Sequence, residues 1–331
     1  MCSCGALASI EPLAVSGKTR RKCQFNDHHS SYASFCKSER FHLHWDRLLP
    51  IYRGDEGTPE QRDAMAELMY ACGLAIEMDY CALESAALVT GHSLRNHFSM
   101  DNTSRIAYRI YYSRDEWDAM VKKELSEGRP IVYTGYNLNK GHAFVCDGYN
   151  ADGLFHINWG WDTLMDGYFA LAELNSAAEK AGAPTDADGS YNMDQMVVMG
   201  IQPKVGQGTP VEHRLFYYSL KPKGHASRAN VSVEVNHLNT DEDGFLGEAT
   251  MGIFSGDGEF VGNIENMIDV NLKASAYMYP TTIGGAVSEN LPDGSYLLSP
   301  ICQLEGDEYA YLMRGRVGAP FVSYLVMQVK G

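Results

Sequence analysis

Two strand-like runs near the middle of the chain carry the residues best suited to catalysis. The first begins with a glycine and a histidine, Gly141 and His142, and the second ends in Asn-Trp-Gly-Trp at residues 158–161. The turn between them is centred on residues 150–153, so antiparallel pairing brings the Asn-Trp-Gly-Trp sequence opposite the start of the His142 strand, within about two residues. An imidazole takes a proton from a nucleophile when a neighbour orients it and apolar rings exclude water. The pattern therefore indicates a general base at His142, and Gly141 allows another backbone to approach closely.

The second run supplies the amide and the indoles that such a base needs. We expect Asn158 to orient the imidazole of His142, and Trp159 or Trp161 to cover its bond to the nucleophile. A zinc site is a poorer interpretation, because it needs three or four converging ligands and only His142 and His156 are near. The structural alternative is a well-filled β core in which the histidine has no chemical role.

Helical spacing of apolar residues precedes these strands. One helix is expected to begin at Pro59, with Thr58 as its N-cap and Gln61 in the capping-box position. A second helix is expected after Ser113, and Gly128 with the following proline ends it. Both helices are interpreted as elements of the core.

Short β-prone runs separated by Asn, Asp and Gly turns fill residues 130–201. Asp147 and Asp166 are interpreted as turn or strand-end residues within this region. Helices followed by antiparallel strands predict an α+β fold, in which the sheet carries His142.

The rest of the chain has a different composition. A linker rich in Pro and Gly occupies residues 202–213, and regularly spaced strand-like runs with turn clusters follow it. We therefore expect one domain over residues 41–203 and an all-β sandwich over residues 204–331, for which the sequence names no partner. Residues 1–40 show neither helical nor strand periodicity, and we expect an atypical N-terminus that is truncated or altered in frame.

Composition excludes several classes of protein. The 331 residues are 45% apolar and 21% charged, and the net charge is -15. A chain this acidic is a poor partner for nucleic acid or an anionic membrane. No apolar run approaches the ~18 residues of a membrane-spanning helix, and no secretory signal peptide is readable. Eight scattered cysteines do not form a disulfide scaffold at this length.

Several motifs resemble the streptopain family of papain-like cysteine peptidases. The runs GHAFVCDGY, FHINWGW and DGYFAL look like its signature, and WDRLLPIY, AMAELMYACGLAIEMDY and MVVMGIQP fall in the family's order over residues 41–203. The trailing β domain resembles C-terminal extensions of gut-bacterial members. The resemblance implies a papain-like fold, a cysteine-type endopeptidase that acts on polypeptides without metal or organic cofactor, and an extracellular or cell-surface location.

The same resemblance implies roles for individual residues. His142 corresponds to the general base and Gly141 to a residue whose backbone contacts the substrate, while residues 158–161 correspond to the sequence that flanks and shields the histidine. Ser85, within CALESAA, stands in the substrate-contacting turn. Thr134 stands where the family's namesake carries a glutamine, so the substrate contacts are expected to differ there.

The nucleophile is the point at which this chain departs most from the family. Cys4, in SCGALAS, precedes small helix-compatible residues, and a helix N-terminus lowers the pKa of a thiol. Cys23 and Cys36 lie among polar residues and are poorer candidates. The resemblance also implies an upstream segment with a glutamine that helps form the oxyanion hole, and no stretch of this sequence matches it. The main alternative is therefore that the true nucleophile has been lost. Two further hypotheses remain: an inactive peptidase-derived binding or adhesion module, and a transglutaminase-like acyl transferase.

Overall fold

A computed structural model describes most of the chain from residue 43 onward. The described residues are 15–16, 40–41, 43–52, 54–80, 85–87, 89–174, 190–207, 215–224, 227–239, 242–274, 276–318 and 320–330, with the backbone alone for 15–16, 40–41, 79–80 and 85–86. They form two compact units. The first comprises Met1–Ala107 and Asp118–Pro210, and the second comprises Tyr108–Trp117 and Val211–Gly331. None of the helices in the described ranges is both long and apolar enough to span a bilayer.

The first unit begins with helices whose caps are readable in the sequence. Helix α1 spans Pro59–Ala75, and Thr58 and Gln61 form the predicted capping box, with the backbone N–H of each residue bonded to the side chain of the other. Helix α2 spans Gly91–Phe98 and has a box of the same kind between Thr90 and Ser93. The remaining elements before the main sheet are short: β1 Val15–Ser16, β2 Arg40–Phe41, the 3-10 helix Trp45–Arg47, β3 Asp79–Tyr80 and β4 Ser85–Ala86.

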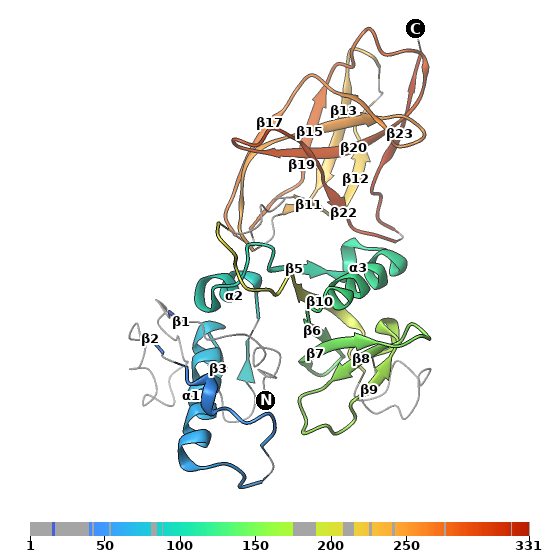
Figure 1. The fold of residues 1–331 in the computed structure, drawn as a ribbon. Helices are drawn as coiled ribbons and strands as arrows, with labels where there is room; N and C mark the ends of the chain where they lie inside the picture. Colours follow the sequence, from blue (N-terminus) through green and yellow to red (C-terminus); the bar gives the residue numbers. More distant parts are fainter. Residues whose placement is uncertain are drawn as a thin grey trace. The chain divides into compact units, whose positions relative to one another are not determined.

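A six-stranded sheet forms the rest of the first unit, in the order β5-β10-β6-β7-β8-β9. Its strands are β5 Arg105–Tyr108, β6 Ile131–Tyr136, β7 Gly141–Tyr149, β8 Phe155–Asn158, β9 Gly167–Phe169 and β10 Met193–Met199. Strands β10, β6, β7, β8 and β9 pair antiparallel with their neighbours, and β6 to β9 lie side by side in Figure 1. Helices first and an antiparallel sheet second confirm the predicted α+β fold.

One row of side chains across β6 and β7 leads from the core to the candidate site. Three pairs of directly opposite residues follow one another on the same face of these strands: Ile131–Cys146, Tyr133–Phe144 and Gly135–His142. The side chains of the first two pairs are fully buried. The third pair stands at the strand end, where burial diminishes, so His142 is half-buried. Because side chains alternate between the two faces of a strand, His142 lies on the same face as the buried Phe144 and Cys146. It stands where that face leaves the core.

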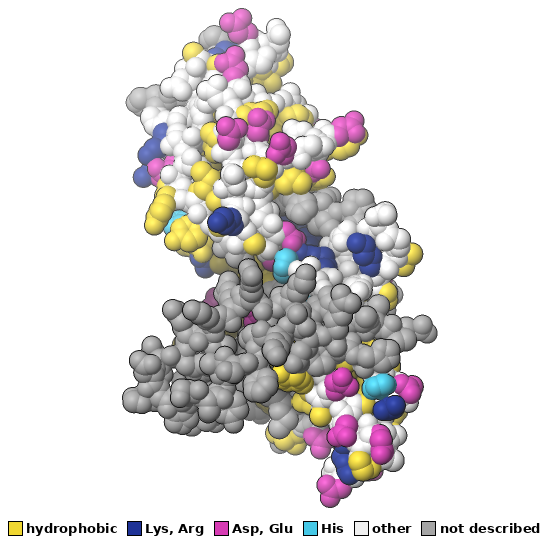
Figure 2. Space-filling view, turned by 90° about the vertical axis from the view of Figure 1, so that its left-hand side faces the viewer, with side chains coloured by type: hydrophobic (Ala, Val, Ile, Leu, Met, Phe, Trp, Pro, Cys, Tyr) yellow, Lys and Arg dark blue, Asp and Glu magenta, His cyan; other side chains and the backbone are white. Residues whose placement is uncertain are grey.

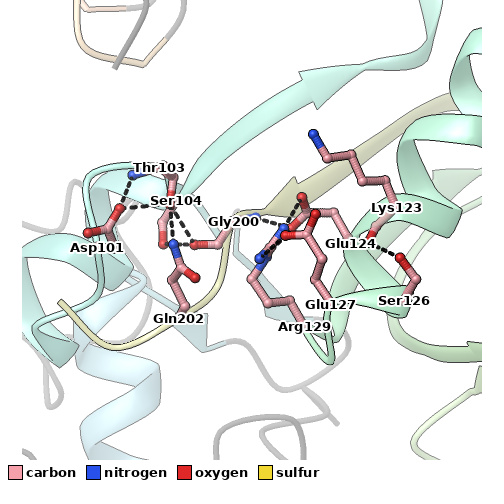
Figure 3. Close-up of polar contacts among 10 residues, drawn as sticks. All are labelled: Asp101, Thr103, Ser104, Lys123, Glu124, Ser126, Glu127, Arg129, Gly200 and Gln202. Carbon is pink, nitrogen blue, oxygen red and sulfur yellow. Dashed lines mark hydrogen bonds and ion pairs between the residues drawn. The ribbon is translucent and has the colours of Figure 1, made fainter. Parts of the chain in front are cut away.

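The end of β10 is held by a polar cluster that Figure 3 shows. Glu124, on helix α3 (Arg114–Ser126), accepts two hydrogen bonds from the guanidinium of Arg129 and one from the N–H of Gly200, each 2.8 Å long. The carbonyl of Gly200 accepts a bond of 2.9 Å from Ser104 Oγ. Burial raises the pKa of Glu124, but the bonds from Arg129 and Gly200 outweigh it and hold that pKa below its ordinary value. The cluster ties β10 to α3 and to the segment before β5.

The second unit is all-β in its described residues from 215 onward, as predicted. Its strands are β11 Phe216–Tyr217, β12 Ser219–Pro222, β13 Val231–Asn236, β14 Leu238–Asn239, β15 Phe245–Phe254, β16 Phe260–Asn263, β17 Ile268–Leu272, β18 Tyr277–Met278, β19 Thr281–Gly285, β20 Gly294–Leu304, β21 Tyr311–Leu312, β22 Arg314–Gly315 and β23 Leu325–Val329. They form sheets of four, three and six strands, the last with β17 and β23 paired beside it. Alternate residues of β13, Val231, Val233 and Val235, enter one shared core.

A short segment from the middle of the sequence completes this second unit. In the 3-10 helix Arg109–Tyr111, the ring of Tyr111 packs on Phe216, with ring centroids 4.8 Å apart. The amide of Asn239 donates a bond of 3.1 Å to the Tyr111 hydroxyl, whose pKa burial raises to about 12. The compact units therefore differ from the predicted domain boundaries, because residues 108–117 pack with the C-terminal strands.

Candidate active site

His142 is held by a main-chain carbonyl. Its Nε2 lies 2.9 Å from the carbonyl oxygen of Trp159. A carbonyl oxygen can only accept a hydrogen bond, so Nε2 carries the hydrogen in the neutral imidazole and donates it. Nδ1 then bears the lone pair, and none of the described residues forms a hydrogen bond with it. The geometry leaves this second nitrogen available to accept a proton.

Two side chains fix the carbonyl that holds the histidine. The N–H of Trp159 donates to Asp166 Oδ1 over 2.9 Å, and the N–H of Gly160 donates to Asn158 Oδ1 over 2.8 Å. Gly160 has φ +75°, a value that glycine adopts without the steric cost that a Cβ would add. The peptide groups on both sides of Trp159 are therefore fixed, and its carbonyl is directed at the imidazole.

Asn158 does not contact His142 in the way that the sequence led us to expect. Its strand partner is Val145, and neighbouring residues of a strand alternate between faces. Val145 follows His142 by three residues in β7, so its side chain lies on the opposite face of the sheet. Asn158, as its partner, lies on that opposite face as well. Its amide shapes the turn at Gly160 instead, and the carbonyl of Trp159 occupies the orienting position predicted for the Asn158 side chain.

Aromatic rings surround the imidazole. Trp161 stacks nearest, with ring centroids 4.9 Å apart and planes inclined by 27°, and Tyr191 follows at 5.4 Å. Phe144 and Trp159 lie at 6.0 and 6.3 Å, and Trp159 is fully buried. The structure thus brings both predicted tryptophans to His142.

The rings and the nearby charge set the protonation of the imidazole. Burial lowers the pKa of His142 from its ordinary value, and the positive charge of Lys140 lowers it further. The hydrogen bond to the Trp159 carbonyl favours the charged form and opposes this shift. The net result is a neutral imidazole at pH 7, the form that accepts a proton.

Two glycines near His142 allow close contacts. A Cβ on Gly141 would lie 2.5 Å from Cε1 of Tyr136. Among the described residues, the group that approaches Gly141 is therefore a side chain, whereas the sequence predicted a second backbone. At Gly135, the strand partner of His142, a Cβ would lie 2.1 Å from the carbonyl oxygen of Tyr191. The close passage of another backbone therefore occurs at Gly135.

No cysteine with a described side chain is placed to act as the nucleophile. Cys72, Cys146 and Cys302 are all buried, and burial raises the pKa of the Cys146 thiol far above its ordinary value. The predicted nucleophile Cys4, with Cys23 and Cys36, lies outside the described residues. Ser85 begins strand β4, but its side chain is outside them as well.

The other histidine of the hairpin has a different environment. Nδ1 of His156 lies 2.5 Å from Asp147 Oδ1, and the two side chains form a surface pair. Across the described part of the chain, no three His, Cys, Asp or Glu side chains come together in a group that could hold a metal ion. His156 is a suitable comparison for His142, because it shares the hairpin but, among the described residues, contacts a single ring, that of Tyr168 at 5.2 Å, in place of the four rings around His142.

Sequence reasoning missed three residues of the site. Asp166 was interpreted as a strand-end residue, but it anchors the N–H of Trp159. Gly135 carried no distinguishing signal in the sequence, and Tyr191 follows a stretch without periodicity. Only the spacing of Asp166 from the Asn-Trp-Gly-Trp sequence offered a signal, since an acidic residue closing a tight loop commonly accepts a backbone hydrogen bond.

Comparisons with known proteins agree with these features. Residues 10–169 match the Peptidase C10 family. The chain is 33% identical over 187 residues to the thiol protease/hemagglutinin PrtT of Porphyromonas gingivalis, covering 55% of this chain and 21% of that protein. It is 35% identical over 161 residues to streptopain of Streptococcus pyogenes, covering 48% and 39%. The chain thus spans well under half the length of these relatives.

Among solved structures, active interpain A of Prevotella intermedia is similar at 27% identity and a TM-score of 0.48, covering 60% of this chain and 82% of that one. The family match includes both the Gly-His pair and the Asn-Trp-Gly-Trp sequence on which the resemblance to streptopain rests. Residues 10–169 of this chain are therefore similar in sequence to the Peptidase C10 family of cysteine peptidases.

Proposed function

We propose that this chain is a cysteine-type endopeptidase in which His142 is the general base. The observation that carries the proposal is the fixed imidazole, whose Nε2 is bonded to the Trp159 carbonyl while Nδ1 has no described hydrogen-bond partner. The match of residues 10–169 to the Peptidase C10 family supports the same reaction. Cys4 is our assignment for the nucleophile, made from the sequence that follows it.

The reaction follows from these assignments. Nδ1 of His142 takes the thiol proton, and the sulfur bonds to the carbonyl carbon of the peptide. The tetrahedral intermediate collapses when the C–N bond breaks, and Nδ1–H gives its proton to the leaving amine. Water then attacks the thioester, its proton passes to Nδ1, and the sulfur leaves and regains that proton. Backbone N–H groups near the nucleophile would stabilise the oxyanion.

The aromatic rings support this cycle in two ways. Trp161 and Trp159 limit the access of water to the imidazole, which strengthens its hydrogen bond to the carbonyl. They also restrict rotation of the ring, so Nδ1 keeps one direction through all four proton transfers. Polypeptides are the substrates that we propose, and the family resemblance favours an extracellular or cell-surface location.

Covalent labelling tests the nucleophile. A thiol-directed epoxide inhibitor of papain-like enzymes should modify one cysteine stoichiometrically, and peptide mapping by mass spectrometry should identify it as Cys4. His142→Ala should abolish selective labelling, because the thiol then has no base to deprotonate it. Modification of several cysteines at similar slow rates would contradict the dyad.

Hydrolysis of casein tests the base. His142→Ala should reduce the rate to background, whereas His156→Ala should retain it, because His156 pairs with Asp147 away from the rings. Equal losses in both variants would overturn the assignment of His142. A folded wild-type chain that neither labels nor hydrolyses casein would instead support the inactive binding module.

A further inference from the structure

Strand β10 contains a bulge next to the strand partner of His142. Asp194 and Gln195 together oppose a single residue of β6, Gly135, which in turn pairs with His142 of β7. Asp194 has φ +43°, within the left-handed region that residues other than glycine seldom adopt. Bulges redirect side chains and are frequent beside active sites. Here the redirected side chain is that of Gln195, which enters the interior.

The amide of Gln195 is buried and uses both of its ends. Its Nε2 donates to the carbonyl oxygens of Leu171 and Tyr191, over 2.7 and 3.3 Å. Its Oε1 accepts a bond of 3.0 Å from the hydroxyl of Tyr133. Only 5% of the residue is exposed, so no solvent replaces these partners when the amide is removed.

Two of the three partners connect to the rings around His142, Tyr191 directly and Tyr133 through Phe144. The ring of Tyr191 lies 5.4 Å from the imidazole, between centroids. The ring of Tyr133 stacks on Phe144 at 5.3 Å with planes inclined by 13°, and Phe144 lies 6.0 Å from His142. A single amide therefore joins two separate contacts that reach the imidazole.

We propose that Gln195 is a positioning residue for His142: by holding Tyr191 and Tyr133 it fixes the rings that restrict the imidazole and so sets the direction of Nδ1. The catalytic consequence rests on the proposed function, but the positioning itself concerns the imidazole alone. A fully satisfied buried polar network favours one arrangement of the groups that it joins, which an apolar side chain of equal size does not do. Gln195 touches neither substrate nor the reacting atoms.

The experiment compares two identical substitutions, one within β10 and the other three residues beyond its end. Gln195→Met removes all three hydrogen bonds with little change in volume. Gln202→Met is the matched control, because the described hydrogen bond of its side chain goes to Thr103 and not to the rings. Spectra of protein with ¹⁵N-labelled histidine report the tautomer and pKa of His142, whose signal is assigned by its loss in His142→Gln.

The wild type and Gln202→Met should show one Nε2–H tautomer for His142. In Gln195→Met the two tautomers should mix, and the pKa should rise toward its ordinary value as the rings loosen and water enters. In peptide hydrolysis kcat should fall about 10- to 100-fold, as misplacement by about an ångström would produce, with KM nearly unchanged.

The outcomes separate this inference from the proposed function. A folded Gln195→Met whose His142 keeps the wild-type tautomer and pKa would refute the positioning role. An altered imidazole in a chain whose wild type hydrolyses no peptide would refute the peptidase and leave the positioning role intact. If Gln195→Met does not fold, Tyr133→Phe decides, because it deletes one hydroxyl and should shift the same signals by less; unchanged signals there refute the inference.

Discussion

Of the glycine-to-alanine substitutions in this sheet, Gly135→Ala should disrupt the site most. The new Cβ would lie 2.1 Å from the carbonyl oxygen of Tyr191, whereas ordinary contacts begin at 3.4 Å. Both atoms are attached directly to backbone, so no side-chain rotation relieves the clash. Strand β6 and the segment at Tyr191 must separate by about 1.3 Å, the difference between these two distances.

The consequences follow from the position of Gly135. It pairs with His142, and the residue that must move carries a ring packed on the imidazole. Overpacking of this kind costs about 1–3 kcal/mol of unfolding free energy. A shift of about 1 Å in the surroundings of a general base can cost about 100-fold in rate. We therefore expect a loss in kcat that is disproportionate to the loss in stability.

Gly148→Ala is the control, because the Cβ there meets only the Cβ of His156, at an ordinary 3.7 Å. Thermal unfolding and steady-state peptide hydrolysis would be measured for both variants beside the wild type. Gly148→Ala should remain within about 1 kcal/mol of the wild type. The reasoning is refuted if Gly135→Ala matches the control in both melting temperature and kcat, since the two backbones would then not meet as described.

Three further substitutions address separate parts of the first unit. Because the pKa of Glu124 is lowered in the folded state, its contribution to stability is present above the unfolded pKa and is lost as pH falls through the lower folded value. Glu124→Gln should therefore weaken the fall in unfolding free energy at acid pH. At pH 7 it should lower the unfolding free energy by about 3 kcal/mol, because Arg129 loses its most buried partner. Denaturant titrations at several pH values would measure both effects. Asp166→Ala should leave the buried N–H of Trp159 unpaired at a cost of about 1–3 kcal/mol and lower kcat, and Asp166→Asn, which keeps an acceptor oxygen, should restore most of both; equal effects would contradict the role of that oxygen. Cys146→Ala should leave epoxide labelling unchanged, because its thiol is fully buried, and loss of labelling on peptide mapping would contradict this.

The charged side chains on one face of the molecule (Figure 2) do not form a binding site for a polyanion among the described residues. On the face that Figure 2 shows, the basic side chains of the described residues are dispersed among acidic and apolar ones and form no continuous patch. With a net charge of -15, such a face gives little attraction to a polyanion. The chemistry of the chain is therefore better sought at His142 than on this surface.

Features that depend on neighbours in sequence were readable before the structure. The capping box of α1 needs only a threonine and a glutamine three residues apart. The hairpin of β7 and β8 needs only two β-prone runs and an Asp-Gly turn. The proximity of His142 to the two tryptophans followed from that hairpin.

Features that depend on register or on distant segments were not readable. A bulge between Cys146 and Gly148 shifts the pairing of β7 with β8, and a shift of one residue exchanges the faces on which side chains lie. The face of Asn158 was therefore beyond what hairpin length alone could predict. The bulge at Gln195 left no mark in composition, and the passage of Tyr191 over Gly135 joins residues 56 positions apart in the sequence.

The main-chain acceptor changes which residues determine the orientation of the base. When a side chain orients an imidazole, its identity is what matters; when a carbonyl does so, the conformation of the backbone is what matters. Asn158 and Asp166 hold the N–H groups on either side of the Trp159 carbonyl, and Gly160 permits the turn between them. Asn158 touches no atom of the imidazole in the described contacts, yet the direction of Nδ1 depends on it. The Asn-Trp-Gly-Trp sequence thus acts through the conformation of its three peptide groups, which directs the Trp159 carbonyl at His142. Its two indole rings pack against the imidazole that this carbonyl holds.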